Sequence, residues 1–364
     1  MEKREKKEKK QWSNKKRFIV FICLFLVLFV FSSEFLTVCD NVNYTNIKGF
    51  YKEEKNSIDV AFIGPSEFYA DYSPTLAWSE FGYTSYSMAC GGTPGSLYKS
   101  MLKEYLKYQS PKLVVFEING FIQKEEYYTK PAKLHTWLDN IPWSQNKIDT
   151  INELVPKDER YSYYVPMASS HSNWNSPITC ANHMYTKINI GLKKESYSKS
   201  FSTYTREFDA TCSGDDNIKL NDKGMGYLKD LLQYCKDQGV EKVLFVRCPH
   251  GKKFVEKKKI KKIKEIIESY GYDFVNFNDC YKKSGIDPTK DFYNKEHLNV
   301  NGMIKFTSYL GKYICDNYSV KTQHSQEQVK RWDECANKTK KIIEQCQEDV
   351  KNGIDKHYWE IRIK

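Results

Sequence analysis

The sequence lacks the cysteine patterns that mark a disulfide framework or a zinc site. Its 11 cysteines are scattered, with no CxxC pair, no Cys/His spacing typical of zinc and no dense cluster. Cys335 and Cys346 fall on one face of a predicted helix, but they are too far apart along it to bridge each other. We therefore expect most thiols to be buried apolar side chains, with one or two disulfides left open. No metal or other cofactor is indicated.

The sequence also lacks a cleavage site after its apolar N-terminal run. Residues 1–17 are rich in Lys and Arg, residues 18–31 are all apolar, and the run extends to Val38 with one interruption at Glu34. A transmembrane helix needs about 17–25 residues, and residues 18–38 reach that range. A cleaved signal peptide is the alternative, but the apolar stretch is long and no small-x-small site follows it.

Two further features of the N-terminal region bear on how the chain is anchored. The segment Leu36-Thr37-Val38-Cys39 resembles a lipobox, but Val38 is too large for the position before the cysteine. The basic lead places the N-terminus in the cytoplasm by the positive-inside rule. The sequence therefore predicts a single-pass cell-membrane protein whose C-terminal domain is extracytoplasmic.

The charge is basic, but its pattern does not indicate nucleic-acid binding. The net charge is +11, and a second dense run of lysines spans residues 252–264. In and just after this run, apolar side chains recur at helical spacing (Ile260, Ile263, Ile266 and Ile267), which is typical of an amphipathic helix with a solvated lysine face. Outside the membrane, such a face suits anionic wall polymer or lipid headgroups. The 27 Tyr and 20 Phe argue against disorder in the body of the chain.

Short apolar strands alternate with helices along much of the chain. Residues 58–63 form a strand-like run that ends in Gly-Pro, and residues 96–108 carry apolar side chains at helical spacing. Further strands are predicted over 84–90, 113–118, 243–247 and 273–277, and further helices over 223–238, 258–269 and 300–313. This alternation predicts an α/β fold with a mostly parallel sheet.

The predicted organisation has five parts. They are a cytoplasmic basic segment (1–17), a transmembrane anchor (18–38), a polar stalk (39–56), an α/β domain (57–318) and an amphipathic helical tail (319–364). Within the domain, residues 123–221 are rich in Tyr, Ser, Asn, Trp and Pro and show only weak periodicity. We interpret them as a long insertion over one end of the sheet, where such loops form substrate walls.

Two residues are candidates for nucleophilic catalysis. Ser66 follows the first predicted strand, where a strand-to-helix turn exposes its hydroxyl at the carboxyl edge of a parallel sheet. His297 lies late in the chain, with Asp291 and Glu296 close before it and a predicted helix after it. A histidine base needs an acceptor on its second ring nitrogen, which such neighbours can supply. The alternatives are a helix-capping serine and an ordinary histidine near a helix start.

Four short motifs together resemble the SGNH/GDSL hydrolase family. They are Gly64-Pro65-Ser66, Gly91-Gly92, Glu117-Ile118-Asn119-Gly120 and His297-Leu298-Asn299. The chain is similar in particular to the membrane-anchored envelope branch, related to proteins that assist D-alanylation of lipoteichoic acid or acetylation of cell-wall polymers. The resemblance covers about residues 57–312 and implies a flavodoxin-like three-layer α/β/α fold.

The resemblance also implies the chemistry of a serine esterase or O-acyltransferase. Ser66 would be the nucleophile that forms an acyl-enzyme, and His297 would be its base. The backbone N–H groups of Ser66 and of Gly91 or Gly92 would bind the oxyanion, with Asn119 as a further donor. The implied partners are an acylated envelope polymer or lipid-linked glycan and a multi-spanning membrane acyltransferase. No cofactor is implied.

The chain departs from the family pattern at two places. Asn294 stands three residues before the histidine, where the family has an aspartate, and Asp291 or Glu296 could substitute for the missing carboxylate. Pro65 and Glu67 flank the nucleophile, where branch members commonly carry Ser and His. The sequence therefore leaves two hypotheses, an active enzyme and a non-catalytic partner that keeps the fold and a polymer-binding cleft.

Overall fold

The computed structural model describes residues 12–38, 40–212, 219–251 and 257–359, which fall into two units. The helical unit comprises the described parts of 1–38 and 161–185, and the main unit comprises those of 39–160 and 186–364. Five predicted segments lie partly outside the described residues. They are the basic segment (at 1–11), the stalk (at 39), the insertion (at 213–218), the lysine run (at 252–256) and the tail (at 360–364).

The main unit is built around a five-stranded sheet in which neighbouring strands are parallel. Its strands are β1 (Val60–Gly64), β2 (Ser85–Ala89), β3 (Leu113–Glu117), β5 (Val243–Arg247) and β6 (Asp273–Asn276), in the spatial order β2-β1-β3-β5-β6. Counted within this sheet, the order is 2-1-3-4-5, the flavodoxin-like form of a doubly wound sheet. The predicted α/β fold with a mostly parallel sheet is confirmed.

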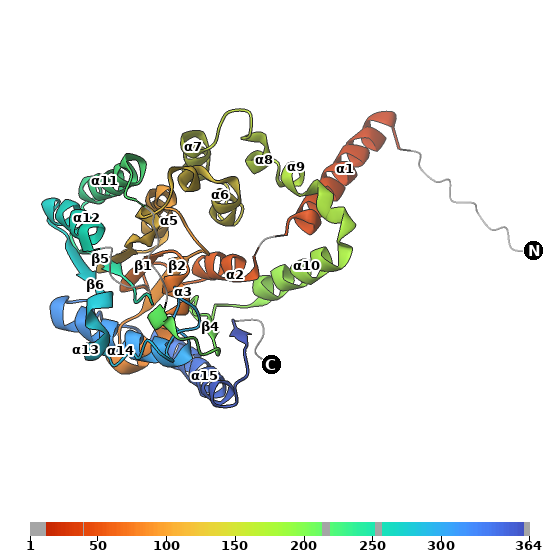
Figure 1. Cartoon of the computed structure of the whole chain (residues 1–364). Coiled ribbons are helices and arrows are strands. Elements are labelled where there is room, and N and C mark those ends of the chain that lie inside the picture. The colour runs from red at the N-terminus through yellow and green to blue at the C-terminus, as the bar shows by residue number, and fades with distance from the viewer. Residues whose placement is uncertain (1–11, 39, 213–218, 252–256, 360–364) are drawn as a thin grey trace, which may run out of the picture. The chain divides into compact units, whose positions relative to one another are not determined.

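Helices cover both faces of the sheet (Figure 1). Helices α5 (Tyr98–Tyr108), α11 (Asp222–Asp237) and α12 (Lys257–Ser269) lie on one side, and α14 (Val300–Asn317) and α15 (Gln326–Lys351) lie on the other. Strands β1, β2, β3 and β5 are buried along their whole length, as expected of strands covered on both faces. The carboxyl ends of the strands therefore meet at one edge, where loops are free to form a site.

The predicted insertion and tail fold as separate helices and one small sheet. The insertion contributes η3 (Glu125–Thr129), α6 (Pro131–Leu138) and α7 (Gln145–Leu154) to the main unit. Its strand β4 (Thr203–Tyr204) pairs antiparallel with β7 (His357–Tyr358) of the tail. In the tail, Ile342, Ile343 and Cys346 of α15 belong to an apolar cluster that also contains residues of α14.

The segment predicted as a polar stalk (39–56) is instead largely a packed helix. Helix α2 spans Asn41–Phe50, and both Ile47 and Phe50 are fully buried. The Phe50 ring lies 4.7 Å, centroid to centroid, from the ring of Tyr105 in α5. The sequence pattern missed this helix because its few apolar residues stand among Asn, Thr and Tyr, which gives a weak helical period.

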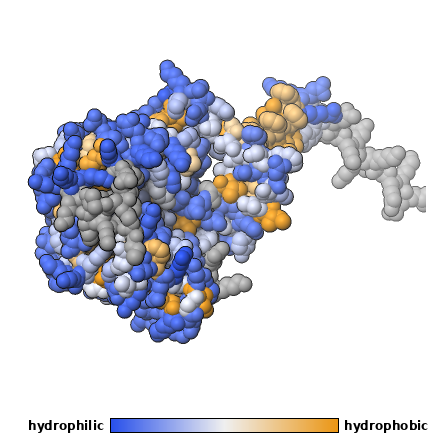
Figure 2. Space-filling view, viewed as in Figure 1, coloured by the Kyte–Doolittle hydropathy of each residue, from blue (hydrophilic) through white to orange (hydrophobic). Residues whose placement is uncertain are grey.

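The helical unit contains the apolar N-terminal helix. Helix α1 (Asn14–Leu36) has a mean hydropathy of 2.7 over its most apolar window and is long and apolar enough to cross a membrane or to act as a signal sequence. Figure 2 shows apolar residues gathered along it. Helices α8 (Tyr161–Tyr164) and α9 (Pro166–Ser170) and the turn η4 (His171–Asn175) share this unit, and α10 (Pro177–Leu192) begins in it.

Most of the described cysteines are buried, as the sequence predicts. Cys180, Cys235, Cys248, Cys335 and Cys346 are buried thiols that form no disulfide within the described ranges. Burial raises the pKa of Cys235 and of Cys346 to about 12, so both stay protonated at neutral pH. These thiols therefore act as small apolar side chains of the core.

Helix α2 should contribute strongly to stability. Phe50→Ala removes a fully buried ring from between α2 and α5, and we expect it to lower the free energy of unfolding by about 3–5 kcal/mol. Lys229→Ala, on the exposed face of α11, serves as the control and should change it by less than about 0.5 kcal/mol. Urea unfolding of the full chain in detergent measures both. Equal free energies of unfolding for the two variants would contradict the packing of α2 against the core.

Candidate active site

Ser66 lies where strand β1 turns into the short helix α3 (Glu67–Ala70). The strand ends in Gly64 because a Cβ there would lie 2.9 Å from the Cβ of Glu117 and 3.0 Å from the Phe68 ring. The Ser66 carbonyl accepts two N–H groups of the first helical turn at 3.2 and 2.9 Å. Its hydroxyl makes no capping hydrogen bond to the helix. The alternative interpretation as a helix-capping serine therefore does not describe its side chain.

The structure brings Ser66 and His297 together across 231 positions of sequence. Ser66 Oγ and His297 Nε2 are 2.7 Å apart, which suits a hydroxyl that donates to an unprotonated ring nitrogen. Tyr293 N–H donates to the His297 carbonyl at 2.9 Å, and Leu298 N–H donates to Asp71 Oδ1 at 2.8 Å. The backbone of the loop is therefore fixed on both sides of the imidazole.

Asn294 provides the acceptor for the second ring nitrogen of His297. Its Oδ1 lies 3.1 Å from His297 Nδ1 and also accepts the backbone N–H groups of Glu296 at 2.8 Å and of His297 at 3.0 Å. An amide NH₂ cannot accept hydrogen bonds from these two backbone donors, so the oxygen must face the ring. His297 Nδ1 therefore carries the hydrogen, and Nε2 keeps the lone pair that the Ser66 hydroxyl needs.

Asp291 lies away from the imidazole and does not supply the missing carboxylate. Its side chain accepts the N–H group of Asp287 at 2.6 Å and forms an ion pair with Lys305 at 2.5 Å. The loop folds back on itself, and Phe292 forms an isolated β-bridge with Leu298. Because of this bridge, Asp291 lies at the base of the loop, three residues from the position that contacts His297.

The predicted oxyanion donors are only partly available. Gly91 N–H already donates to Asn43 Oδ1 at 2.8 Å. Gly92 has φ +65°, a conformation that favours glycine, and a Cβ there would lie 2.5 Å from the Tyr127 hydroxyl. Within the described part of the chain, the N–H groups of Gly92 and Ser66 have no hydrogen-bond partner. These two N–H groups therefore remain as the candidate oxyanion hole.

Asn119, expected as a further oxyanion donor, instead joins a buried network next to Ser66. Its Nδ2 donates to Glu67 Oε1 and lies 2.8 Å from His250 Nε2, and its Oδ1 accepts from Arg247 Nη1. Both ends of the amide are therefore occupied. The carboxylate of Glu67 thus accepts from the amide that was expected to donate to the oxyanion.

Sequence reasoning missed three residues of this region, Asn43, Arg247 and His250. Arg247 and His250 are each only 2% exposed, and His250 Nε2 lies 3.3 Å from Glu67 Oε1. Arg247 is the last residue of strand β5, and His250 follows the strand. Polar residues at the carboxyl end of a parallel strand are candidates for a site, so the sequence could have indicated both. Asn43 belongs to α2, in the segment that was predicted to be a stalk.

Three buried carboxyl groups near the site differ in ionisation. Burial opposes ionisation of Glu67, but hydrogen bonds and the neighbouring histidines outweigh it and lower its pKa to about 2. Burial and the charge of Glu67 raise the pKa of Glu117 well above its ordinary value, and burial does the same for Asp71. Of these three, Glu67 is the group whose pKa is lowered, so it is ionised at neutral pH. Its Oε2 is 3.4 Å from Ser66 Oγ.

Glu67, Glu117 and His250 also place ligand atoms within 4.8 Å of one another. Carboxylate and imidazole ligands suit a divalent transition metal. Glu117, however, accepts the backbone N–H groups of Asn119 and Cys248, and Glu67 accepts the side chain of Asn119. We therefore interpret these three residues as part of a hydrogen-bonded cluster around an ionised Glu67.

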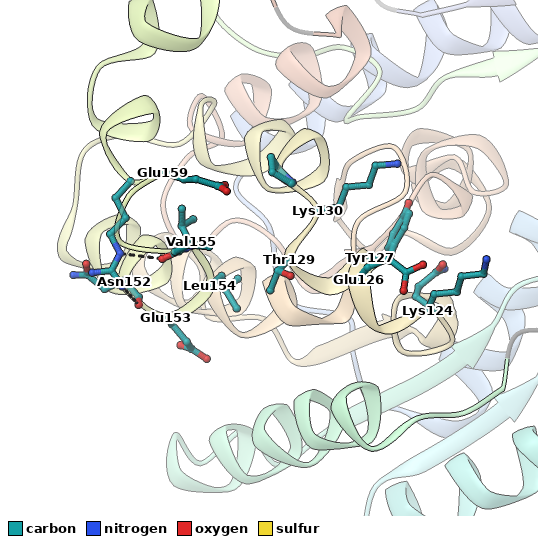
Figure 3. A pocket seen from close by; sticks show the side chains of 14 residues that line it. Lys124, Glu126, Tyr127, Thr129, Lys130, Asn152, Glu153, Leu154, Val155 and Glu159 are labelled. Carbon is teal, nitrogen blue, oxygen red and sulfur yellow. Dashed lines mark hydrogen bonds between the residues drawn. The ribbon is translucent and has the colours of Figure 1, made fainter.

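A pocket of about 840 Å³ lies in the part of the main unit formed by η3, α6 and α7. Figure 3 shows Lys124, Tyr127 and Lys130 on one side of it and residues 152–155 with Glu159 on the other. The Tyr127 hydroxyl donates to the Gly92 carbonyl at 2.9 Å. This hydrogen bond joins the wall of the pocket to the candidate oxyanion loop.

Comparisons with known proteins add little to this geometry. No family model and no curated protein matches the chain. Among solved structures, it is similar to a protein provisionally assigned as a platelet activating factor from Streptococcus pneumonia, with 12% identity over 81% of this chain and 99% of that chain and a TM-score of 0.32. It is also similar to a gut microbial diltiazem-metabolizing enzyme, with 12% identity over 73% of this chain and 49% of that chain and a TM-score of 0.27. Likenesses this low carry no argument about function.

Covalent labelling of Ser66 by a fluorophosphonate should require the neutral form of His297. Burial lowers the pKa of His297 below its ordinary value of 6.5, although the charges of Glu67 and Glu296 oppose this shift. The labelling rate should therefore rise with pH through a midpoint below 6.5 and stay level up to about pH 8. Gel-based labelling across this range gives the midpoint. A midpoint above about 7 would contradict a buried, neutral base.

Proposed function

We propose that the protein is a membrane-anchored serine esterase or O-acyltransferase that acts on acyl esters of cell-envelope glycopolymers. The observation that carries this proposal is the hydrogen bond of 2.7 Å from Ser66 Oγ to His297 Nε2. It is supported by the acceptor that Asn294 places on His297 Nδ1. A nucleophile, a base and an orienting group in this order are the elements of acyl transfer through a serine.

The proposed reaction has two halves. In the first, Ser66 Oγ attacks the ester carbonyl while its proton passes to His297 Nε2, and the N–H groups of Ser66 and Gly92 bind the oxyanion. Collapse of the intermediate breaks the bond to the leaving alcohol, which takes the proton from His297. In the second, water or a sugar hydroxyl gives its proton to His297 and attacks the acyl-enzyme. The acid or new ester leaves, and Ser66 regains its proton.

A glycopolymer substrate is proposed from the surroundings of the site. The pocket joined to Gly92 through Tyr127 is large enough for a sugar-sized group and combines an aromatic ring with charged and amide side chains. The apolar helix α1 suits a membrane anchor that would hold the domain beside envelope polymers. A multi-spanning acyltransferase that exports the acyl group would be the source of the acyl donor.

A second candidate function is a non-catalytic binding partner of an envelope acylation complex. Two observations favour it, the neutral Asn294 on His297 and the ionised Glu67 3.4 Å from the nucleophile. A carboxylate at this position opposes the negative charge of an oxyanion. Serine labelling separates the two functions, because a binding protein that has lost turnover has no need of an activated hydroxyl.

Ser66→Ala should abolish both serine labelling and turnover. We expect hydrolysis of p-nitrophenyl acetate to fall at least about 1000-fold, since the nucleophile and the acyl-enzyme are both lost. Ser79→Ala, on the exposed part of α4 (Pro74–Phe81), is the matched control and should retain full activity. Hydrolysis that survives in Ser66→Ala would refute the enzyme. Absence of labelling in the unaltered folded protein would favour the binding partner.

The C-terminal domain should lie on the outer side of the membrane. The basic residues before α1 favour an N-terminus in the cytoplasm. A reporter enzyme that is active only outside the cytoplasm, fused behind residue 364, should therefore be active. The control fusion carries acidic residues in place of the Lys and Arg of 1–17 and should lose most of this activity. Activity of a cytoplasm-specific reporter at the same fusion point would contradict the proposed orientation.

A further inference from the structure

We propose that Glu67 supplies the negative charge of the catalytic constellation, whereas Asn294 supplies only its geometry. This inference rests on the proposed function, because it assigns roles around the Ser66–His297 pair. In a serine triad, one carboxylate both fixes the histidine tautomer and stabilises the imidazolium. Here these two tasks fall to residues on different segments, the loop of His297 and the turn that carries the nucleophile.

The geometry places Glu67 where the imidazolium charge would form. Glu67 is only 4% exposed, and its Oε2 lies 3.4 Å from Ser66 Oγ. The same Oγ lies 2.7 Å from His297 Nε2. When the Ser66 proton moves to Nε2, the new positive charge therefore develops on the side of the ring that faces Glu67. Because Glu67 is buried and Ser66 and His297 are half-buried, this attraction is stronger than it would be in water.

Neighbouring side chains keep Glu67 charged and in place. Its Oε1 accepts the Asn119 amide and lies 3.3 Å from His250 Nε2. Arg247 in turn donates to the Asn119 oxygen, which fixes the amide that holds the carboxylate. Although burial opposes ionisation, the contacts with His250 and Asn119 and the neighbouring histidines lower the pKa of Glu67 to about 2, so its carboxyl group is ionised at neutral pH.

Other titratable groups around the pair do not replace Glu67. Burial raises the pKa values of Asp71 and Glu117 well above their ordinary values, which disfavours a negative charge on either group. Burial likewise keeps the Tyr127 phenol neutral by raising its pKa to about 12. Glu296, in the His297 loop, is the other anion that acts on His297. Besides Ser66 and His297, the described residues that face Glu67 or its partners include His250, Arg247 and Asn119.

Glu67 should act mainly on the proton transfer. The negative charge of Glu67 stabilises the imidazolium but destabilises the oxyanion. The activity of a variant that lacks this charge shows which of the two effects on the rate is larger. Glu67→Gln should lower kcat/KM for p-nitrophenyl acetate by about 10–100-fold, the size expected for one charge at this range. It should also move the midpoint of the pH profile to a lower value, because a charge that raises the pKa of His297 is lost.

The decisive test restores the charge at the other position. In the Glu67→Gln background, Asn294→Asp should recover kcat/KM to within about threefold of the unaltered protein and raise the midpoint again. Asn294→Asp alone should raise kcat/KM by less than about tenfold, because Glu67 already provides the charge. Equal gains from Asn294→Asp in both backgrounds would overturn the proposal. So would a Glu67→Gln variant that is as active as, or more active than, the unaltered protein.

Two control variants separate charge from packing. Glu117→Gln alters the same buried cluster at a carboxyl group whose pKa is raised by burial and by the charge of Glu67, so it should move the midpoint of the pH profile less than Glu67→Gln does. Glu296→Gln removes the other anion near His297, and a larger shift there than in Glu67→Gln would assign the charge to Glu296 and overturn the proposal. Far-UV circular dichroism checks that each variant folds. If Glu67→Gln does not fold, Asn294→Asp alone decides: a gain below about tenfold supports the proposal, and a larger gain overturns it because it shows that the charge was missing.

Failure of this proposal can be told from failure of the proposed function. If Ser66→Ala hydrolyses the ester as fast as the unaltered protein, the serine mechanism itself is wrong. If Ser66→Ala is inactive while Glu67→Gln keeps full activity and the same pH midpoint, only the role of Glu67 is wrong. Glu67→Asp, which keeps the charge on a shorter side chain, should retain more activity than Glu67→Gln.

Discussion

The site depends first on the orientation of one amide oxygen, Oδ1 of Asn294. An asparagine beside a catalytic histidine can present either an acceptor or a donor, and only the acceptor leaves the far ring nitrogen able to take a proton. Two backbone N–H groups of the same loop occupy Oδ1 together with His297 Nδ1. The β-bridge between Phe292 and Leu298 closes that loop, so backbone structure fixes a tautomer that a carboxylate would otherwise fix by its charge.

The strand order determines which charged groups can meet at this site. Strands β2, β1, β3 and β5 are neighbours in the sheet, and each ends at the same edge with part of the site. From β2 to β5, these ends carry Gly92, then Ser66 and Glu67, then Glu117 and Asn119, and last Arg247 and His250. Buried like charges repel, so the charge of Glu67 adds to the effect of burial in raising the pKa of Glu117. The contacts with His250 and Asn119 lower the pKa of Glu67 instead.

The sequence was sufficient to predict the sheet and the two residues that meet across it. Buried parallel strands leave short apolar runs, and the turn after the first of them contains Ser66. The polar neighbours of His297 marked it as a candidate base. That Asp291 lies away from the imidazole could not be predicted, because it depends on how the loop folds back. Asn43 was missed because α2 has a weak apolar period. The contacts of Arg247 and His250 depend on strand order, which a single sequence does not give.

A base oriented by an amide differs chemically from one paired with a carboxylate. Without a charge on Nδ1, burial leaves the pKa of His297 low, so the imidazole stays neutral over a wider range of acidic pH. A weaker base, however, accepts the nucleophile's proton less readily. A charge near the other nitrogen compensates for this in the transition state, where the imidazolium forms, and Glu67 lies on that side. Separating the two tasks thus favours a base that remains neutral, and therefore able to accept a proton, at mildly acidic pH.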